Sequence, residues 1–434
     1  MAEVTGASKY ELFDIYSKDG STKLSLLGYI INFQYFEDLH SPCVSAVLDI
    51  ANTGNIKDGK GFYNGLPIRK GERVHFKIKT PLDDALDKEA TLEYVLYVND
   101  VKDIVMDKQF ESFRLSLVSR EQLTNDQVRV ARKYTGMTIN KVVDQMIRIL
   151  DPLAINEIEE CESPCTVYGN MRKPFRIVTQ LCKKAVPVGA KSKSAGFFFW
   201  QTREGFNFRS IHGLIKSAVD NKKTIQKKKY VYSQLMDSSI EDPLINAYKI
   251  LDIKANSTGD LSDSLGKGED SIYRIYFNPF TFEFTQPNTS VFKNPKETRL
   301  GKAEKAPLVA DPENIPNTMF ASRITFGILD AGTATAGVST ALNWDPLNSE
   351  AQALSDYSRF FSQDYTLLIP CNTGLLAGEP IYIEIPDNTS EEPDIDTEQS
   401  GLYIIKEITH IFGPTTSYTG LRVVRDSLGI TGQK

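Results

Sequence analysis

The sequence predicts a mainly β fold, with two similar antiparallel β-barrel domains, an α+β helix-helix-hairpin domain between them, and an insertion in the second barrel. Three observations lead to this prediction. Apolar and polar residues alternate near both ends of the chain, apolar spacing becomes helical after residue 126, and one order of turns and strands occurs twice. A length of 434 residues also suggests about three domains. The predicted domains are residues 1–125, residues 126–215, residues 216–285 together with 351–434, and the insertion 286–350.

Five segments of the first domain carry apolar residues at every second position, the period of a half-buried strand. Glycines between several of these segments supply turns. Five or more short strands at this spacing favour a small antiparallel barrel or sandwich, because such a sheet buries one face. The expected strands are Leu24–Phe36, Val44–Ile50, Arg73–Ile78, Leu92–Ile104 and Phe113–Val118.

The middle domain begins with helical spacing. Apolar residues in 139–150 recur every three or four positions, and Pro152 follows where a helix should end. A second helix is expected at 175–185, because Pro174 suits the first helical turn. Two aromatic runs around a polar turn predict a β-hairpin over 197–208.

The second half of the chain returns to strand patterns. Residues 216–229 contain six lysines, which predicts a solvated face or linker, with a local phosphate contact as the alternative. Strand alternation resumes over 245–284, whereas 286–350 is proline-rich and predicts an inserted subdomain or surface excursion. A helix is then expected at 351–361. Six acidic residues between 387 and 398 predict an exposed hairpin loop. The closing strands are expected at Tyr365–Ile369, Ile381–Ile385, Leu402–Ile411 and Leu421–Val424.

The two β-rich ends share an order of elements at a nearly constant separation of 306 to 307 residues. We interpret this order as a duplicated domain. The alternative is that any two antiparallel barrels share such turns and strands. Two similar barrels in one chain would indicate assembly rather than catalysis. Three segments near the start correspond to three near the end: Gly71-Glu72 to Gly378-Glu379, Leu96-Tyr97-Val98 to Leu402-Tyr403-Ile404, and Leu115-x-Leu117 to Leu421-x-Val423.

The amino-acid composition argues against several classes of function. The net charge of -6 disfavours a dedicated DNA-binding protein, which needs a basic excess. Four histidines offer little material for imidazole catalysis or a multi-histidine metal site. Five cysteines suggest free thiols in a reducing compartment, and the absence of a signal peptide or membrane span predicts a cytoplasmic product. The glycosylation triplets at Asn256, Asn288 and Asn388 are then chance matches.

The sequence offers few candidates for chemistry, and we predict no catalytic, cofactor-binding or metal-binding residue. No nucleotide-binding, esterase or zinc-protease motif is present. Cys161, Cys165 and Cys182 supply three thiols but no fourth zinc ligand, so buried or surface thiols are preferred. His212 and His410 are expected to satisfy local hydrogen bonds. The carboxylate pairs are expected to be solvated rather than glycosidase-like; they are Glu159-Glu160, Glu391-Glu392 and Asp394-x-Asp396.

Three strings carry a family resemblance. They are Tyr168-Gly169-Asn170-Met171-Arg172-Lys173-Pro174-Phe175-x-Ile177, Gly196-Phe197-Phe198-Phe199-Trp200-Gln201-Thr202-Arg203-Glu204-Gly205-Phe206, and Ser400-Gly401-Leu402-Tyr403-Ile404-Ile405 followed by His410-Ile411-Phe412. Together they resemble the baseplate hub subunit of contractile-tailed, myovirus-type bacteriophages. The resemblance covers nearly the whole chain apart from residues 286–350.

The resemblance implies a structural, non-enzymatic virion protein of the tail baseplate, assembled in the host cytoplasm. In such hubs the two barrels are tube-type, and a homotrimer forms a near-sixfold ring that joins the hexameric tail tube to the trimeric central spike. The implied partners are the spike protein, the tail tube and tape-measure proteins, and other baseplate (wedge) proteins. DNA would only pass through the channel, with no sequence-specific binding. The chain lacks the oligonucleotide-fold barrel and β-helical repeat of a fused spike, so a separate spike protein is implied.

Two alternatives stay open from the sequence. One is a cell-wall hydrolase or carbohydrate-binding tail protein, which would depend on Glu159, Glu160, Glu391 or Glu392. The other keeps the hub fold but places it in a phage-derived contractile injection particle that carries no DNA.

Overall fold

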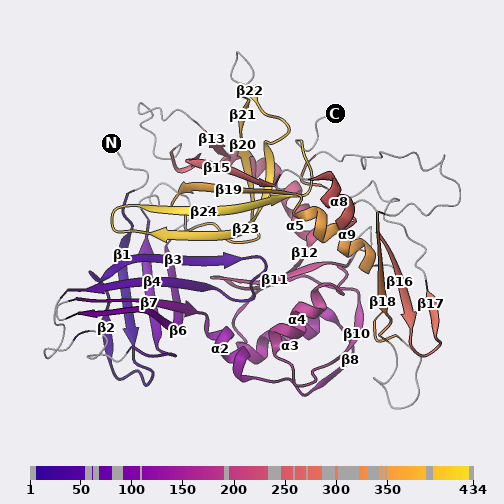
Figure 1. The fold of residues 1–434 in the computed structure, drawn as a ribbon, viewed down its shortest axis with the longest axis horizontal. Helices are drawn as coiled ribbons and strands as arrows, with labels where there is room; N and C mark the ends of the chain where they lie inside the picture. Colours follow the sequence, from indigo (N-terminus) through magenta and orange to yellow (C-terminus); the bar gives the residue numbers. More distant parts are fainter. Residues whose placement is uncertain are drawn as a thin grey trace.

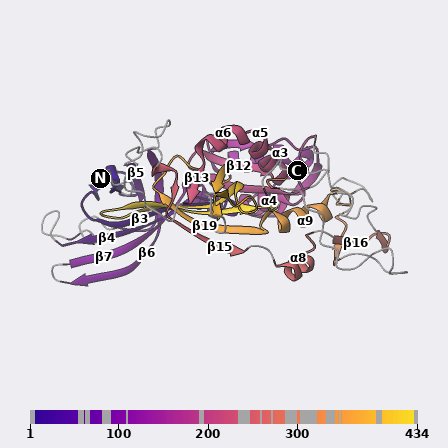
Figure 2. The same ribbon diagram turned by 90° about the horizontal axis from the view of Figure 1, so that it is seen from above.

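The protein is mainly β, as the alternation predicts. A 14-stranded sheet runs through both ends of the chain, and a three-stranded sheet lies to one side (Figure 1). Figure 2 shows the helices of the middle domain on one side of the large sheet. The computed structural model describes residues 6–53, 61, 68–80, 91–107, 110–189, 195–232, 246–257, 260–269, 272–285, 299–301, 322–330, 342–344, 346–347, 349–387 and 394–429.

The first β region follows the predicted alternation closely. Its strands are β1 (Lys9–Tyr16), β2 (Lys23–Ser25), β3 (Ile30–Asp38), β4 (Ser45–Asn52), β5 (Arg73–Lys79), β6 (Leu92–Asp107) and β7 (Phe110–Val118). They lie in the order β2-β1-β5-β6-β7-β4-β3, and every second residue of β4 is buried. One prediction is wrong in detail. The segment 24–36 is not one strand, because a turn with Gly28 at φ +88° separates β2 from β3. Strand β1 was not predicted.

The second β region is built from segments that lie far apart in the sequence. The strand path is β13-β20-β23-β24-β19-β15, with the short β14 beside β13. The bounds are β13 (Tyr230–Tyr232), β14 (Lys249–Ile250), β15 (Asp252–Ser257), β19 (Gln363–Pro370), β20 (Pro380–Glu384), β23 (Gly401–Phe412) and β24 (Ser417–Arg425). Each of the four predicted closing strands is present, within one to four residues at its ends.

The strand pairings of the two regions correspond one for one. In the first region β1 pairs with β5, β5 with β6, β6 with β7, β7 with β4, and β4 with β3. In the second, β13 pairs with β20, β20 with β23, β23 with β24, β24 with β19, and β19 with β15. These strands also follow one another in the same order along the chain. One pair differs in direction, because β1 is antiparallel to β5 whereas β13 is parallel to β20.

The two regions share one continuous sheet. Residues Glu407–Phe412 of β23 pair with Phe33–Asp38 of β3 in antiparallel register. The two separate closed barrels that the sequence predicts are not seen in the described strands. One edge of β3 pairs with β23 of the second region, and among the described strands β2 forms an open end of the sheet. Alternation predicts which face of a strand is buried but not which strand it pairs with, so the sequence could not reveal this joint.

The middle domain confirms the predicted helices and hairpin. Helices α3 and α4 pack against the hairpin of β11 and β12, and their apolar stripes form one core with its aromatic side chains. Short strands β8, β9 and β10 were not predicted. The bounds are α2 (Arg120–Gln127), β8 (Lys133–Thr138), α3 (Ile139–Leu150), β9 (Ile155–Ile158), β10 (Pro164–Tyr168), α4 (Pro174–Cys182), β11 (Phe197–Thr202), β12 (Gly205–Ser210) and α5 (Ile211–Asp220).

The lysine-rich stretch and the acidic loop behave as predicted where they are described. The lysines of 216–228 lie on α5, α6 (Lys222–Ile225) and η1 (Gln226–Lys228), and Lys229 directly follows η1. All six except the half-buried Lys222 are exposed. Strands β21 (Pro386–Asp387) and β22 (Asp394–Ile395) form the base of the acidic hairpin, whose residues 388–393 lie outside the described part. No helix in the described ranges is long and apolar enough to cross a membrane.

The insertion differs from the prediction at its start. Strands β16 (Ile272–Asn278) and β17 (Glu283–Thr285) were expected in the second barrel, but they lie in a separate sheet, in which β16 pairs with β17 on one side and with β18 (Arg323–Ile328) on the other. The pairing of β16 with β18 is parallel and spans about fifty residues, which strand alternation cannot reveal. Helices α8 (Leu261–Lys267) and α9 (Glu350–Phe360) lie beside this sheet, and α9 confirms the helix expected at 351–361.

Candidate functional site

Three parts of the chain meet at the end of β3. They are the turn between β11 and β12, the loop that precedes β20, and strand β23. The side chains Phe33 and Tyr35 of β3 lie against Phe412 and His410 of β23, with ring centroids 5.9 Å and 6.0 Å apart. This junction fixes the first β region to the second, so we treat it as the candidate site for assembly.

Glu37 is the centre of this junction and is almost fully buried. Its carboxylate accepts hydrogen bonds from the Tyr35 hydroxyl at 2.9 Å, from the Arg203 backbone N–H at 2.9 Å and from the Ala377 backbone N–H at 3.1 Å. Burial raises its pKa to about 7, although these three donors oppose the shift. One side chain therefore ties β3 to the middle domain and to the loop before β20.

Trp200 forms a second link between the same parts. It is buried on β11, and its indole N–H donates to the Ala377 carbonyl at 2.9 Å. Gly378 follows with φ +90°, and a Cβ at this position would lie 2.5 Å from the Trp200 ring. Position 378, the first residue of the Gly-Glu turn in the repeat, therefore requires glycine, because of its positive φ and because the Trp200 indole lies so close.

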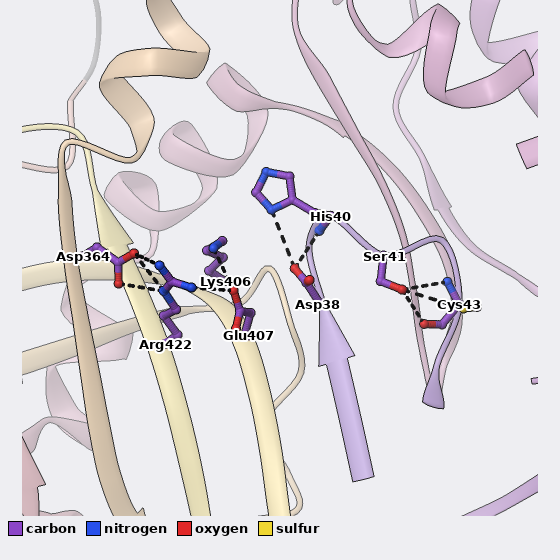
Figure 3. Close-up of polar contacts among 8 residues, drawn as sticks. All are labelled: Asp38, His40, Ser41, Cys43, Asp364, Lys406, Glu407 and Arg422. Carbon is purple, nitrogen blue, oxygen red and sulfur yellow. Dashed lines mark hydrogen bonds and ion pairs between the residues drawn. The ribbon is translucent and has the colours of Figure 1, made fainter. Parts of the chain in front are cut away.

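A row of charged side chains crosses the second region towards β3 (Figure 3). Arg422 on β24 donates to both oxygens of Asp364 on β19, at 3.0 and 2.8 Å, and binds Glu407 on β23 at 3.1 Å. Lys406 binds the same oxygen of Glu407 at 2.7 Å. The hydrogen bond to Asp364 raises the pKa of Arg422. This row aligns β19, β24 and β23 beside the joint.

Asp38 ends β3 opposite Glu407 in the strand register. Its carboxylate accepts a hydrogen bond from the His40 backbone N–H at 2.8 Å, and the His40 imidazole lies 3.7 Å away (Figure 3). Burial alone would raise the pKa of Asp38, but the contacts with His40 outweigh it and lower that pKa. Ser41 then closes the turn by donating to the Cys43 carbonyl at 2.8 Å. The end of β3 is thus fixed in place before β4 begins.

We expect the Asp364–Arg422 pair to stabilise the fold by a coupling of about 1 kcal/mol, because its geometry is bidentate and Asp364 is buried. The measurement is a double-mutant cycle of Asp364→Asn and Arg422→Gln in urea unfolding. The exposed helical pair Asp144–Arg148 is the matched control, with about 0.3–0.5 kcal/mol expected. A coupling at Asp364–Arg422 no larger than that of the control would contradict this role.

The three candidate cysteines lie in the core of the middle domain. All five cysteines are free thiols, and Cys161, Cys165 and Cys182 are buried. Burial raises the pKa of Cys161 to about 12 and that of Cys165 to about 11, which keeps both protonated. In the described part of the chain, no group of three or more histidine, cysteine or acidic side chains is placed to hold a metal ion.

Both candidate histidines make local contacts. His410 is buried in the joint, and its Nδ1 lies 2.9 Å from the Thr419 hydroxyl. Burial lowers the pKa of His410 to about 3, so the ring is neutral. His212 on α5 lies 3.1 Å from the Asp356 carboxylate on α9. The two rings belong to different clusters and do not form one site.

Of the candidate carboxylates that the structure describes, Glu159 is half-buried and not solvated as predicted. Glu159 accepts hydrogen bonds from the Ser210 backbone N–H at 2.6 Å and its hydroxyl at 2.8 Å, which positions the start of α5. Glu160 is exposed, and Asp396 accepts backbone hydrogen bonds in its own turn. Strand β22 begins at Asp394, and Glu391 and Glu392 lie outside the described residues.

A cleft between the middle domain and the second region contains none of these candidates. Its polar side chains bind one another: Asn156 donates to Asn207 at 2.9 Å, and Asn372 donates to the Tyr230 hydroxyl at 3.0 Å. The first contact lies within the middle domain and the second within the second region, so each wall of the cleft is held by its own hydrogen bonds.

Sequence reasoning missed Glu37, the central residue of the junction. A signal was present, because Phe33, Tyr35 and Glu37 occupy alternate positions of one strand and so share its buried face. A carboxylate in that series predicts a buried group with specific donors. Nothing in the sequence identifies those donors as Arg203 and Ala377.

Comparison with known proteins supports the fold. No protein-family model matches the chain, and no curated protein sequence matches it. Among solved structures, the prophage MuSo2 43 kDa tail protein from Shewanella oneidensis has a TM-score of 0.50 at 11% identity, over 97% of this chain and 98% of that one. The tail protein from Neisseria meningitidis MC58 has a TM-score of 0.50 at 10% identity, over 95% and 97%. The expected resemblance is therefore confirmed for the fold: along nearly its whole length, the chain has the fold of these two tail proteins.

Proposed function

We propose that the protein is a structural baseplate hub subunit of a contractile phage tail. In this proposal three chains form a ring that joins the hexameric tail tube to a trimeric central spike. The ring leaves a channel through which DNA passes. The tape-measure and wedge proteins are its further partners, and the assembled protein resides in the tail baseplate of the virion after assembly in the host cytoplasm.

The single observation that carries this proposal is the matching set of strand pairings in the two β regions. A threefold spike cannot contact a sixfold tube evenly unless an adaptor presents three copies of one surface and six of another. Two equivalent β regions per chain supply six copies in a trimer. The unequal parts, the middle domain and the insertion, supply three.

Charge and fold support the same role. A channel that conducts DNA should lack a basic lining, because lysine and arginine would hold the phosphates. The net charge of -6 suits such a channel. The likeness in fold to two tail proteins agrees with a place in a tail.

The test is the oligomeric state of the purified chain, alone and with its spike protein, measured by native mass spectrometry. The proposal predicts three chains per particle, and three hub chains with three spike chains in the complex. A chain that stays monomeric in both samples would overturn the proposal. A peptidoglycan-release assay on the wild type and on the Glu159→Gln variant completes the test. If the wild type releases peptidoglycan fragments and the Glu159→Gln variant does not, the cell-wall hydrolase is favoured instead.

A further inference from the structure

Strand β6 has an edge that no described strand covers. Its pairing with β5 ends at Tyr97, and from Asp100 to Met106 the one described strand that pairs with it is β7. Ile104, Val105 and Met106 on this extension are 43%, 53% and 48% exposed. Proteins rarely leave a long edge with apolar side chains open, because it pairs readily with another strand. This edge is suited to receive a strand.

The corresponding strand of the second region shows how such an edge is used. Strand β23 matches β6, and both shift register at the same place, between Ile405 and Glu407 in β23 and between Val98 and Asp100 in β6. Strand β6 shifts once more, between Lys102 and Val105, where β23 stays regular. Beyond that shift, β23 pairs with β3 of the first region. The pairing buries His410 and Phe412, whereas the matching end of β6 stays exposed.

The strand that matches β3 is β15, which pairs with β19 as β3 pairs with β4. Within the described residues β15 has no second partner strand, and Lys254 and Ala255 on it are exposed. Within one chain, the pairing of β23 with β3 already fixes the two β regions relative to each other. For that reason β6 cannot form the same kind of joint with β15 of its own chain. The available β15 belongs to a second copy.

We infer that β6 of one chain pairs with β15 of the next chain, in an antiparallel joint that repeats the β23–β3 joint. This inference rests on the proposed ring and names its seam. The register follows from the internal joint, where Ile411 lies opposite Gln34 and Phe412 opposite Phe33. Beyond the second shift of β6, the partners on β7 set the correspondence. Ile411 and Phe412 pair with Tyr418 and Ser417 of β24, which lie 306 residues after Ser112 and Glu111 of β7. Ser112 and Glu111 pair with Val105 and Met106. These counterparts place Val105 opposite Lys254 and Met106 opposite Ile253 of the neighbouring chain. The apolar pair Phe412–Phe33 thus becomes the apolar pair Met106–Ile253.

Cysteine crosslinking tests this register. The double variant Met106→Cys and Ile253→Cys should form disulfide-linked chains under mild oxidation, because directly opposite strand residues bring their Cβ atoms close enough. The matched control pairs Met106→Cys with Lys254→Cys, where the second side chain points to the other face of the strand. Crosslinking equal in both variants, or absent from the first in a sample that is trimeric, would overturn the seam.

A charge at the seam gives an independent readout. Met106→Glu should raise the dissociation constant of the assembly at least about tenfold, because its carboxylate would be buried in the joint. Met106 is exposed within one chain, so the monomer should fold normally. Leu153→Glu, at a 91% exposed position on the middle domain, is the control and should leave assembly unchanged. Equal assembly of both variants in a trimeric wild-type background contradicts the seam but leaves the hub role intact. A wild-type chain that never assembles contradicts both.

Discussion

Replacing Glu37 by alanine is expected to lower the free energy of unfolding by about 3–5 kcal/mol. The change removes the acceptor of three buried donors, the Tyr35 hydroxyl and the backbone N–H groups of Arg203 and Ala377. Each buried donor that is left without an acceptor costs about 1–3 kcal/mol, and water that enters the space left by the side chain offsets part of this cost. Urea unfolding of the purified chain measures the loss. The control is Glu204→Ala, an exposed carboxylate in the adjoining turn, for which a change below about 0.5 kcal/mol is expected. Similar losses in both variants would show that Glu37 does not hold the junction.

The pH dependence of stability gives a second readout for Glu37. Its pKa is raised from 4.5 to about 7 in the folded chain, so the folded state binds more protons than the unfolded state in that window. The Glu37 contribution to stability should therefore be fully present below pH 4.5 and should fall as pH rises towards 7. The difference in stability between the wild type and Glu37→Gln, measured across this range, isolates the effect. A difference that does not vary with pH would contradict a protonated Glu37.

Replacing Gly378 by alanine is the second large effect, with an expected loss of about 2–4 kcal/mol. The positive φ of +90° strains any residue with a Cβ, and that Cβ would lie 2.5 Å from the buried Trp200 ring. Thermal or urea unfolding measures the change. Gly20→Ala is the matched control, because Gly20 has φ +72° but no atom within 4 Å of an added Cβ. It should show only the backbone cost, about 1 kcal/mol. Equal losses at the two glycines would mean that the contact with Trp200 has no effect.

Local patterns in the sequence predict local structure well. Helix α3 begins and ends at the residues that its apolar spacing marks, Ile139 and Leu150, because one amphipathic stripe faces one core. The hairpin of β11 and β12 also follows from its turn. The repeat of 306 to 307 residues connects segments that form corresponding strands in the structure.

Long-range partners could not be predicted in the same way. The alternation in β16 is as regular as in β20, yet β16 joins β18 in a separate sheet. The joint between β3 and β23 depends on strand edges, which side-chain patterns do not encode. Glu37 is visible as a charge on a buried face, but two of its three donors, the backbone N–H groups of Arg203 and Ala377, lie more than 160 positions away.

The most direct test of the account is electron microscopy of the assembled protein viewed along its axis. If the two β regions act as equivalent units, class averages should show six similar lobes around the central opening and three larger lobes outside them. A trimer with only three inner lobes, or a particle with no central opening, would contradict the claim that one chain supplies two equivalent positions of a sixfold ring.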